Sequence, residues 1–199
     1  MKKLLFALCI LGISGTAMAQ KIKKQSGDFK DLKNLGTINL VFIYDDMTVG
    51  KNLTEEEYIE SKVADYNMKE AGKGDEWREK WINNRQDVYE PKFAELFNKY
   101  AKDINMKVKE GVEADVTLEV HTYYTEPGWN IGISRKPAHI HVRYRFVDNA
   151  TGEVIAEFDQ QKVPGSDVSG YDFDMSQRLG ESYAKAGKSF AKFLDGKVK

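Results

Sequence analysis

The sequence predicts an α+β fold of two layers (an α/β sandwich), with a mixed four-stranded sheet and helices on one face. Hydrophobic residues alternate with polar ones over 115–124 and 138–147, as in strands that bury one face. They recur at helical spacing over 54–103 and again over 179–194. The predicted order of elements is therefore β-α-α-β-β-β-α.

The first 19 residues have the form of a secretory signal peptide. Two lysines precede an apolar run from Leu4 to Ile13, and small residues then lead to an expected cleavage before Gln20. The run is too short to anchor the chain across a bilayer. Cys9 is the only cysteine and would leave with this segment. We therefore expect a soluble, disulfide-free protein that is exported to the periplasm or secreted.

Net charge and chain length indicate a single-domain protein that is not a nucleic-acid-binding protein. The 199 residues carry a formal net charge of −1, so the chain has no long-range attraction for nucleic acid. A mature chain of this size can bury a core as one domain. We expect a flexible segment over 20–36 and a single α/β domain over 37–199.

The first predicted strand spans 37–47, where β-forming residues place apolar side chains on both faces. A helix should follow from Thr54 to about Glu70, because Thr54 and Glu57 have the spacing of a capping box. The glycines at 72 and 74 should end it.

A second helical segment is expected over 75–103. Pro91 should bend or divide it, because proline lacks the amide hydrogen that a helix interior needs. Trp77 and Trp81 lie four residues apart, which favours an aromatic packing face.

Three strands should follow, over 115–124, 138–147 and 153–158, with a tight turn over 148–152 before the last. Residues 125–137 form a long loop that carries Trp129 between Pro and Gly residues. A C-terminal amphipathic helix closes the chain.

The segments VTLEVHTYY and HIHVRYRFVDNATGEVIAEF, followed by the closing helix, resemble the amino-terminal domain of TolB and related small α/β domains of bacterial envelope proteins. The resemblance covers roughly 37–195. TEEEYIESKVADYN, GDEWREKW and TEPGWNIGISRKP are also similar to a family of secreted Bacteroidota proteins. Together these resemblances imply an envelope location and a binding or assembly role, and they supply no catalytic residues.

All three histidines of the chain, His121, His139 and His141, lie on the predicted polar faces of neighbouring strands. Because the apolar faces of both strands turn to the core, paired residue numbers should sum to an even value, here about 262. The expected pairs are Glu119 with Arg143, His121 with His141, and Tyr123 with His139. Three imidazoles could then bind one zinc ion, with Glu119 activating a zinc-bound water.

The other interpretation of this face is a solvent-facing set of polar cross-strand partners. On that interpretation the chain is an exported envelope module without catalytic activity, which binds an envelope protein or a small ligand and needs no cofactor. The expected binding residues are Glu119, Tyr123, Trp129, Arg143 and Arg145, on the open sheet face and the 125–137 loop. The alternative is a zinc-dependent hydrolase or hydratase built on the three histidines.

Overall fold

The computed structural model describes residues 21–165 and 174–198, and within them eight strands form one mixed sheet in the order β1-β10-β9-β6-β2-β5, with β3 and β4 beside it. A separate hairpin pairs β7 with β8. In chain order the strands are β1 (Ile22–Gly27), β2 (Gly36–Ile43), β3 (Thr48–Val49), β4 (Leu53–Thr54), β5 (Met106–Glu110), β6 (Val116–Glu126), β7 (Trp129–Asn130), β8 (Arg135–Lys136), β9 (His139–Asp148) and β10 (Val154–Pro164).

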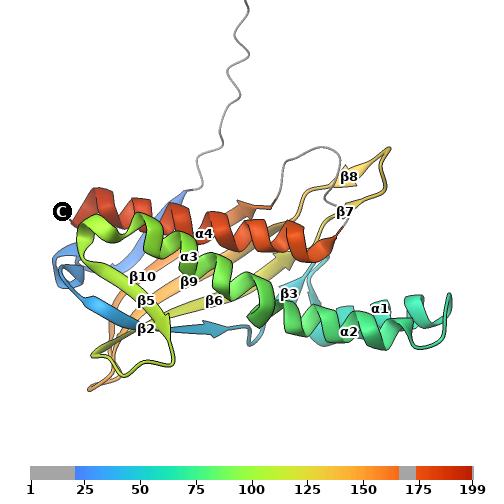
Figure 1. Cartoon of the computed structure of the whole chain (residues 1–199), viewed down its shortest axis with the longest axis horizontal. Coiled ribbons are helices and arrows are strands. Elements are labelled where there is room, and N and C mark those ends of the chain that lie inside the picture. The colour runs from blue at the N-terminus through green and yellow to red at the C-terminus, as the bar shows by residue number, and fades with distance from the viewer. Residues whose placement is uncertain (1–20, 166–173, 199) are drawn as a thin grey trace, which may run out of the picture.

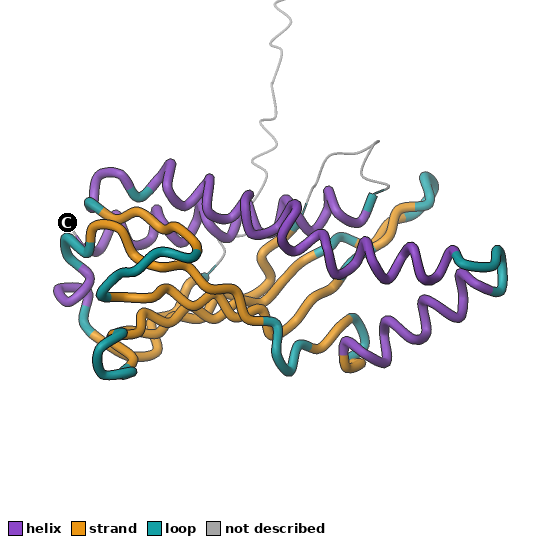
Figure 2. The backbone as a smooth tube through the Cα atoms, turned by 60° about the horizontal axis from the view of Figure 1, so that its bottom comes forward, coloured by secondary structure: helices purple, strands orange, loops and turns teal. Residues whose placement is uncertain are grey.

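Helices α3 and α4 pack on one face of the sheet, whereas the α1–α2 pair extends past its end (Figure 1, Figure 2). The helical segments are η1 (Phe29–Leu32), α1 (Glu55–Asn67), α2 (Lys73–Asn84), the π-helical η2 (Arg85–Tyr89), α3 (Glu90–Tyr100), η3 (Lys102–Ile104) and α4 (Met175–Val198). The α+β class, the mixed sheet and the packed helices agree with the prediction.

The predicted number of four strands is wrong, because the sheet has further edge strands that are short or mostly exposed: β5 alternates over only five residues, and β1 does not alternate. β5 has the sequence MKVKE and pairs in parallel with β2. β1 has the sequence IKKQSG, is mostly exposed, and pairs antiparallel with β10. Charged, exposed residues are typical of strands at a sheet edge.

The expectation of a flexible segment over 20–36 is also corrected. Besides strand β1, this segment contributes η1, whose Leu32 is fully buried in the core. The Phe29 ring lies 5.8 Å from Phe158 and 5.9 Å from Phe193, measured between centroids. The segment is therefore part of the packed structure.

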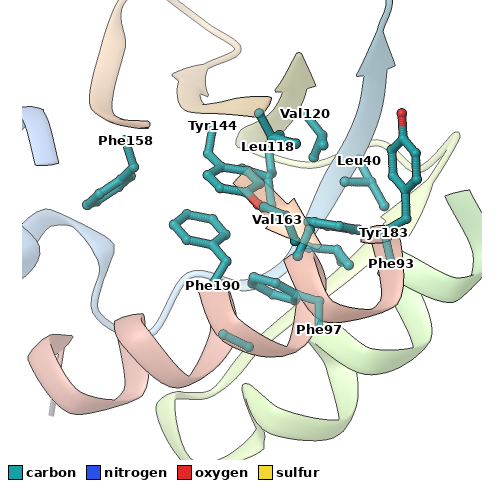
Figure 3. Packing of buried hydrophobic residues seen from close by; sticks show 14 of the residues in the cluster. Leu40, Phe93, Phe97, Leu118, Val120, Tyr144, Phe158, Val163, Tyr183 and Phe190 are labelled. Atoms are coloured by element: carbon teal, nitrogen blue, oxygen red, sulfur yellow. The ribbon is translucent and has the colours of Figure 1, made fainter. Parts of the chain in front are cut away.

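The core lies between the sheet and the α3–α4 pair (Figure 3). Tyr144 of β9 stacks on Phe190 of α4 with ring centroids 3.8 Å apart. The two helices approach closely at Gly187, where an added Cβ would lie 2.3 Å from the Phe93 carbonyl oxygen. This contact fixes the spacing of the helical layer.

The helical region is divided as the sequence predicts. The capping box forms at the start of α1, where the Thr54 hydroxyl accepts from the Glu57 amide at 3.2 Å and the Glu57 carboxylate accepts from the Thr54 amide at 2.9 Å. The π-turn η2 ends just before Pro91, the second residue of α3. Since Pro91 has no amide hydrogen to donate, the regular series of α-helical backbone hydrogen bonds is interrupted at Pro91.

The predicted signal peptide, residues 1–19, lies outside the described residues. Among the residues that the structure describes, none of the helices has both the length and the apolar character needed to span a bilayer.

Candidate functional site

The polar sheet face has a different register from the predicted one. β6 and β9 are antiparallel, and Glu119 pairs with Arg145 while His121 pairs with Arg143. The two strands are thus shifted relative to each other by two residues from the predicted pairing. Because the shift is even, these four side chains still lie on the expected face.

A β-bulge between Thr122 and Tyr124 then changes the face on which later residues of β6 lie. Regular alternation over 115–124 would place Tyr124 on the same face as the buried Leu118 and Val120. Its ring instead lies 4.7 Å from His141 and 5.6 Å from His139. Thr125 takes the buried position instead. The alternation of the sequence does not show this bulge.

The predicted meeting of three histidines on one metal ion does not occur. The His121 Nε2 atom lies 2.9 Å from the Asp45 carbonyl oxygen. The Tyr123 ring lies 6.4 Å from the His121 ring and 5.7 Å from the His141 ring. Within 21–165 and 174–198, no three His, Cys, Asp or Glu side chains are grouped so that they could hold a metal ion.

The charged residues predicted as a binding patch form ion pairs across neighbouring strands. Arg145 bonds Glu119 at 2.7 Å, and Arg143 lies 3.6 Å from Glu157 and over the Tyr123 ring. The Tyr123 hydroxyl donates to Asp159 at 2.8 Å, and burial together with this bond raises the pKa of Tyr123 to about 12. These groups are cross-strand partners that stabilise the sheet.

The 125–137 loop contains the β7–β8 hairpin, which projects from the sheet (Figure 1). Trp129 lies on β7 and is 43% exposed, so it is accessible, as the sequence predicts. Ile131 and Ile133 at the tip are more exposed still.

Buried charges hold the base of this hairpin. Glu126 is almost fully buried, accepts from the Gly128 amide at 3.1 Å and pairs with Lys136. Arg178 of α4 is also buried and donates to the Pro127 carbonyl at 3.2 Å. Gly128 has φ +63°, and an added Cβ would lie 2.4 Å from the Lys136 carbonyl oxygen. The hairpin is therefore fixed at its base and presents Trp129 in a defined place.

Trp129 faces a cleft of about 550 Å³ between the hairpin, the α1–α2 pair and the start of α4. We call it the aromatic cleft. It is lined by Tyr58, Lys62, Tyr66, Trp77, Lys80 and Asn84 from α1 and α2, by Pro127, Gly128, Trp129 and Asn130 from the hairpin, and by Asp174, Met175, Ser176 and Arg178 around the start of α4.

One wall of the cleft is a series of stacked rings. Tyr66 stacks on Trp77 at 5.9 Å, and Trp77 stacks on Trp81 at 5.6 Å. Tyr58 packs against Trp81 at 5.1 Å, and burial raises the pKa of Tyr58. The predicted packing role holds for Trp81, which is buried, but Trp77 is only partly buried and lines the cleft.

Polar groups surround these rings. Lys62 places its ammonium 5.7 Å from the centre of the Tyr58 ring, and Lys80 is exposed on α2. Asp174 accepts hydrogen bonds from the Ser176 amide and hydroxyl at 2.8 and 2.9 Å, so it caps the start of α4. The cleft thus combines aromatic faces, amides, a hydroxyl and more cations than anions.

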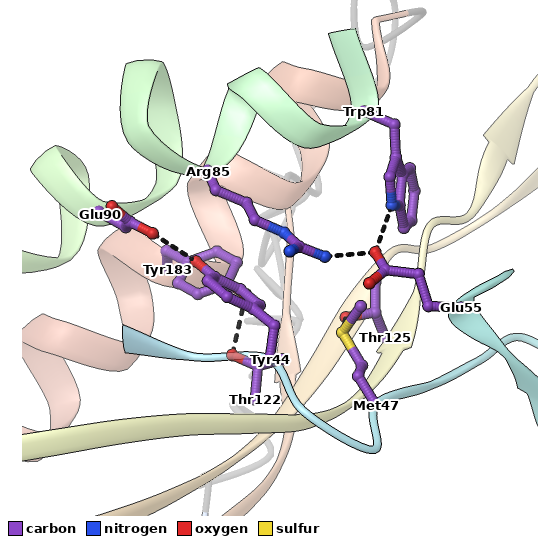
Figure 4. A network of polar contacts seen from close by, with 9 residues as sticks. All are labelled: Tyr44, Met47, Glu55, Trp81, Arg85, Glu90, Thr122, Thr125 and Tyr183. Atoms are coloured by element: carbon purple, nitrogen blue, oxygen red, sulfur yellow. Dashed lines mark hydrogen bonds and ion pairs between the residues drawn. The ribbon is translucent and has the colours of Figure 1, made fainter. Parts of the chain in front are cut away.

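A polar network holds the aromatic wall against the body of the protein (Figure 4). The Trp81 indole donates to Glu55 at 2.5 Å, and Arg85 pairs with the same carboxylate. The Arg85 guanidinium also lies 4.1 Å from the centre of the Tyr44 ring. The first turn of α1, the end of α2 and the end of β2 are therefore tied together at one point.

The network continues inward through Tyr44, whose hydroxyl donates to Glu90 at 3.1 Å. Burial raises the pKa of both Tyr44 and Glu90. Nearby, the Tyr183 and Thr122 hydroxyls lie 2.9 Å apart (Figure 4). These are packing and positioning contacts, which set the angle at which α1 and α2 leave the sheet.

Sequence reasoning missed most of the cleft. Tyr58, Lys62 and Tyr66 follow one helix with a weakly amphipathic pattern, and nothing local links them to a loop 60 residues later. The four-residue spacing of Tyr58, Lys62 and Tyr66 does indicate that these side chains share one face of a helix.

Comparisons with known proteins give weak similarities only. No family model matches the chain, and no curated protein does. A PelC dodecamer structure from Paraburkholderia phytofirmans shares 12% identity over 85% of this chain and 97% of that chain, with a TM-score of 0.40.

A DUF330 protein from Xanthomonas campestris shares 9% identity over 84% of this chain and 89% of that one, with a TM-score of 0.34. A putative neuraminyllactose-binding hemagglutinin homolog from Helicobacter pylori shares 11% over 88% and 91%, also with a TM-score of 0.34. Similarities at this level carry no argument about the site. None of the three is a TolB domain, and that resemblance stays a prediction.

Proposed function

We propose that this chain is an exported, non-catalytic binding module of the cell envelope, which holds its ligand in the aromatic cleft. The observation that carries the proposal is a cleft of about 550 Å³ where partly exposed rings and polar side chains from three separate elements meet. Sites for small ligands are typically concave, of this size, and lined by aromatic groups with a few polar ones.

Export follows from the form of residues 1–19 and belongs to the same proposal. The 125–137 loop keeps the binding role that its sequence suggests, because Trp129 forms one side of the cleft. The polar sheet face has a supporting role in this account, since Arg143 and Arg145 already pair with acids of neighbouring strands.

The test uses the intrinsic fluorescence of the protein. The chain has three tryptophans; Trp77 and Trp129 line the cleft and Trp81 stacks on Trp77. The purified mature protein is screened against a library of saccharides, nucleotides, amino acids and short peptides. A ligand in the cleft should change the emission and raise the melting temperature, because it binds only the folded chain.

Trp129→Ala should weaken binding of any such ligand by about tenfold, the loss expected when one stacking ring is removed. Ile133→Ala is the matched control, because it removes an exposed apolar side chain from the same hairpin but outside the cleft. Equal affinities of the two variants would contradict the assignment of the cleft.

A further inference from the structure

Two lysines line the cleft wall and form no ion pair there with any of the described residues. Lys62 and Lys80 both line the cleft, from α1 and α2. In the part of the chain that the structure describes, neither forms an ion pair with an acid. Two cations that form no ion pair and lie beside a concave site attract a negatively charged ligand.

The acid on the opposite side does not cancel this charge. The Asp174 carboxylate already accepts two hydrogen bonds at the start of α4. Its position also disfavours a phosphate at that helix end, because the carboxylate occupies the amide that a phosphate would use and repels a second anion. The negative group of the ligand should therefore lie toward α1 and α2.

The rings beside the lysines specify more than charge. Trp77 and Tyr66 stack on one wall, and Trp129 lies on the hairpin opposite the α1–α2 pair. A flat face made of C–H bonds packs well on such rings, since the face of an aromatic ring carries partial negative charge. The C–H face of a pyranose has this property, while its hydroxyls point outward around the edge.

Those hydroxyls need partners, and the cleft supplies them. Asn84, Asn130 and Ser176 are among its lining residues. An amide side chain has two donors and an acceptor with two lone pairs, so it can bond a ligand hydroxyl in addition to a contact within the protein. Stacking faces, amides and lysines without an ion pair to a described residue, all in one cleft, match a sugar that carries a carboxylate.

We infer that the ligand of the aromatic cleft is an acidic saccharide, with its carboxylate beside Lys62 and Lys80 and a pyranose face on the rings. The inference rests on the proposed function, because it names the ligand class for the same site.

The experiment titrates the mature protein with oligosaccharides that contain galacturonate, mannuronate, glucuronate or sialate, and follows tryptophan emission. Each is paired with its methyl-esterified form, which keeps the ring and removes the charge. At least one acid should bind, about tenfold more tightly than its ester, and added salt should weaken that binding.

Lys62→Gln combined with Lys80→Gln should lower affinity for the acid to about that for its ester. The control is Lys188→Gln combined with Lys192→Gln, which removes the same charge from lysines that lie over the Tyr100 ring, outside the cleft. This control should bind the acid as the unmodified protein does.

Equal affinity for acid and ester would overturn the inference and leave the proposed function standing. The same holds if no saccharide binds while a nucleotide or peptide from the broader library binds at Trp129. If neither the acidic panel nor the library changes emission or melting temperature, both proposals fail.

Discussion

Single residues decide how the cleft is built, and the decisive ones are buried charges. Glu126 and Arg178 would be costly to bury without partners, yet each is bonded to the backbone of the hairpin base. Their bonds to Gly128 and Pro127 fix the direction in which β7 leaves the sheet. Trp129 therefore stands in a preorganised position and does not have to be ordered when a ligand binds.

Two histidines on the open sheet face should make stability depend on pH. Burial lowers the pKa of His139 and His141 below the ordinary value of 6.5. The negative charge of Glu126 opposes this effect at His139, and that of Asp159 opposes it at His141. Lys162 lowers the pKa of both histidines further, and Lys136 lowers that of His139. Between pH 6.5 and the lowered values, the unfolded chain therefore binds more protons than the folded one.

The melting temperature should then fall as the pH is lowered through this window and level off below it. The measurement is thermal unfolding at a series of pH values, for the unmodified chain and for a variant combining His139→Gln with His141→Gln. A smaller fall in the variant is expected. An identical pH profile for both proteins would show that these imidazoles do not carry the effect.

At the scale of elements, the helical layer depends on the close approach of α3 and α4 at Gly187. Gly187→Ala should destabilise the protein by about 1–3 kcal/mol, because the new methyl group would overlap the Phe93 carbonyl. The free energy of unfolding is measured by urea denaturation.

Gly196→Ala is the control on the same helix. Nothing lies within 4 Å of the added Cβ there, so the change should be neutral or stabilise by up to about 1 kcal/mol through helix propensity. If both substitutions had the same effect on the free energy of unfolding, the packing contact between α3 and α4 would not be the reason that position 187 requires glycine.

Elements also show what the sequence could predict. The rule that paired residue numbers sum to an even value placed Glu119, His121, Arg143 and Arg145 on the correct face of the sheet, because alternation defines which side of a strand is buried. Parity does not fix the register, so the pairing was wrong by two residues. The bulge after Thr122 has no local signal, and it moved Tyr124 away from the core.

At the scale of the whole molecule, the fold class was predictable and the cleft was not. Alternation and helical spacing are local, and they gave the three central strands and the capped helix α1. The cleft depends on the angle of the α1–α2 pair, which Glu55, Arg85 and Trp81 set through contacts between distant parts of the chain. The binding role predicted for Trp129 stays a prediction, now with the residues of the aromatic cleft as its neighbours.

The most direct test of the central claim is an NMR titration that follows the tryptophan indole and histidine ring signals together. The titrants are the library compounds that raise the melting temperature. Binding in the aromatic cleft predicts that the Trp129 and Trp77 indole signals shift, while the rings of His121 and His141 on the open sheet face do not. Shifts confined to those histidines, with all three indole signals unchanged, would contradict the account and return the site to the sheet face.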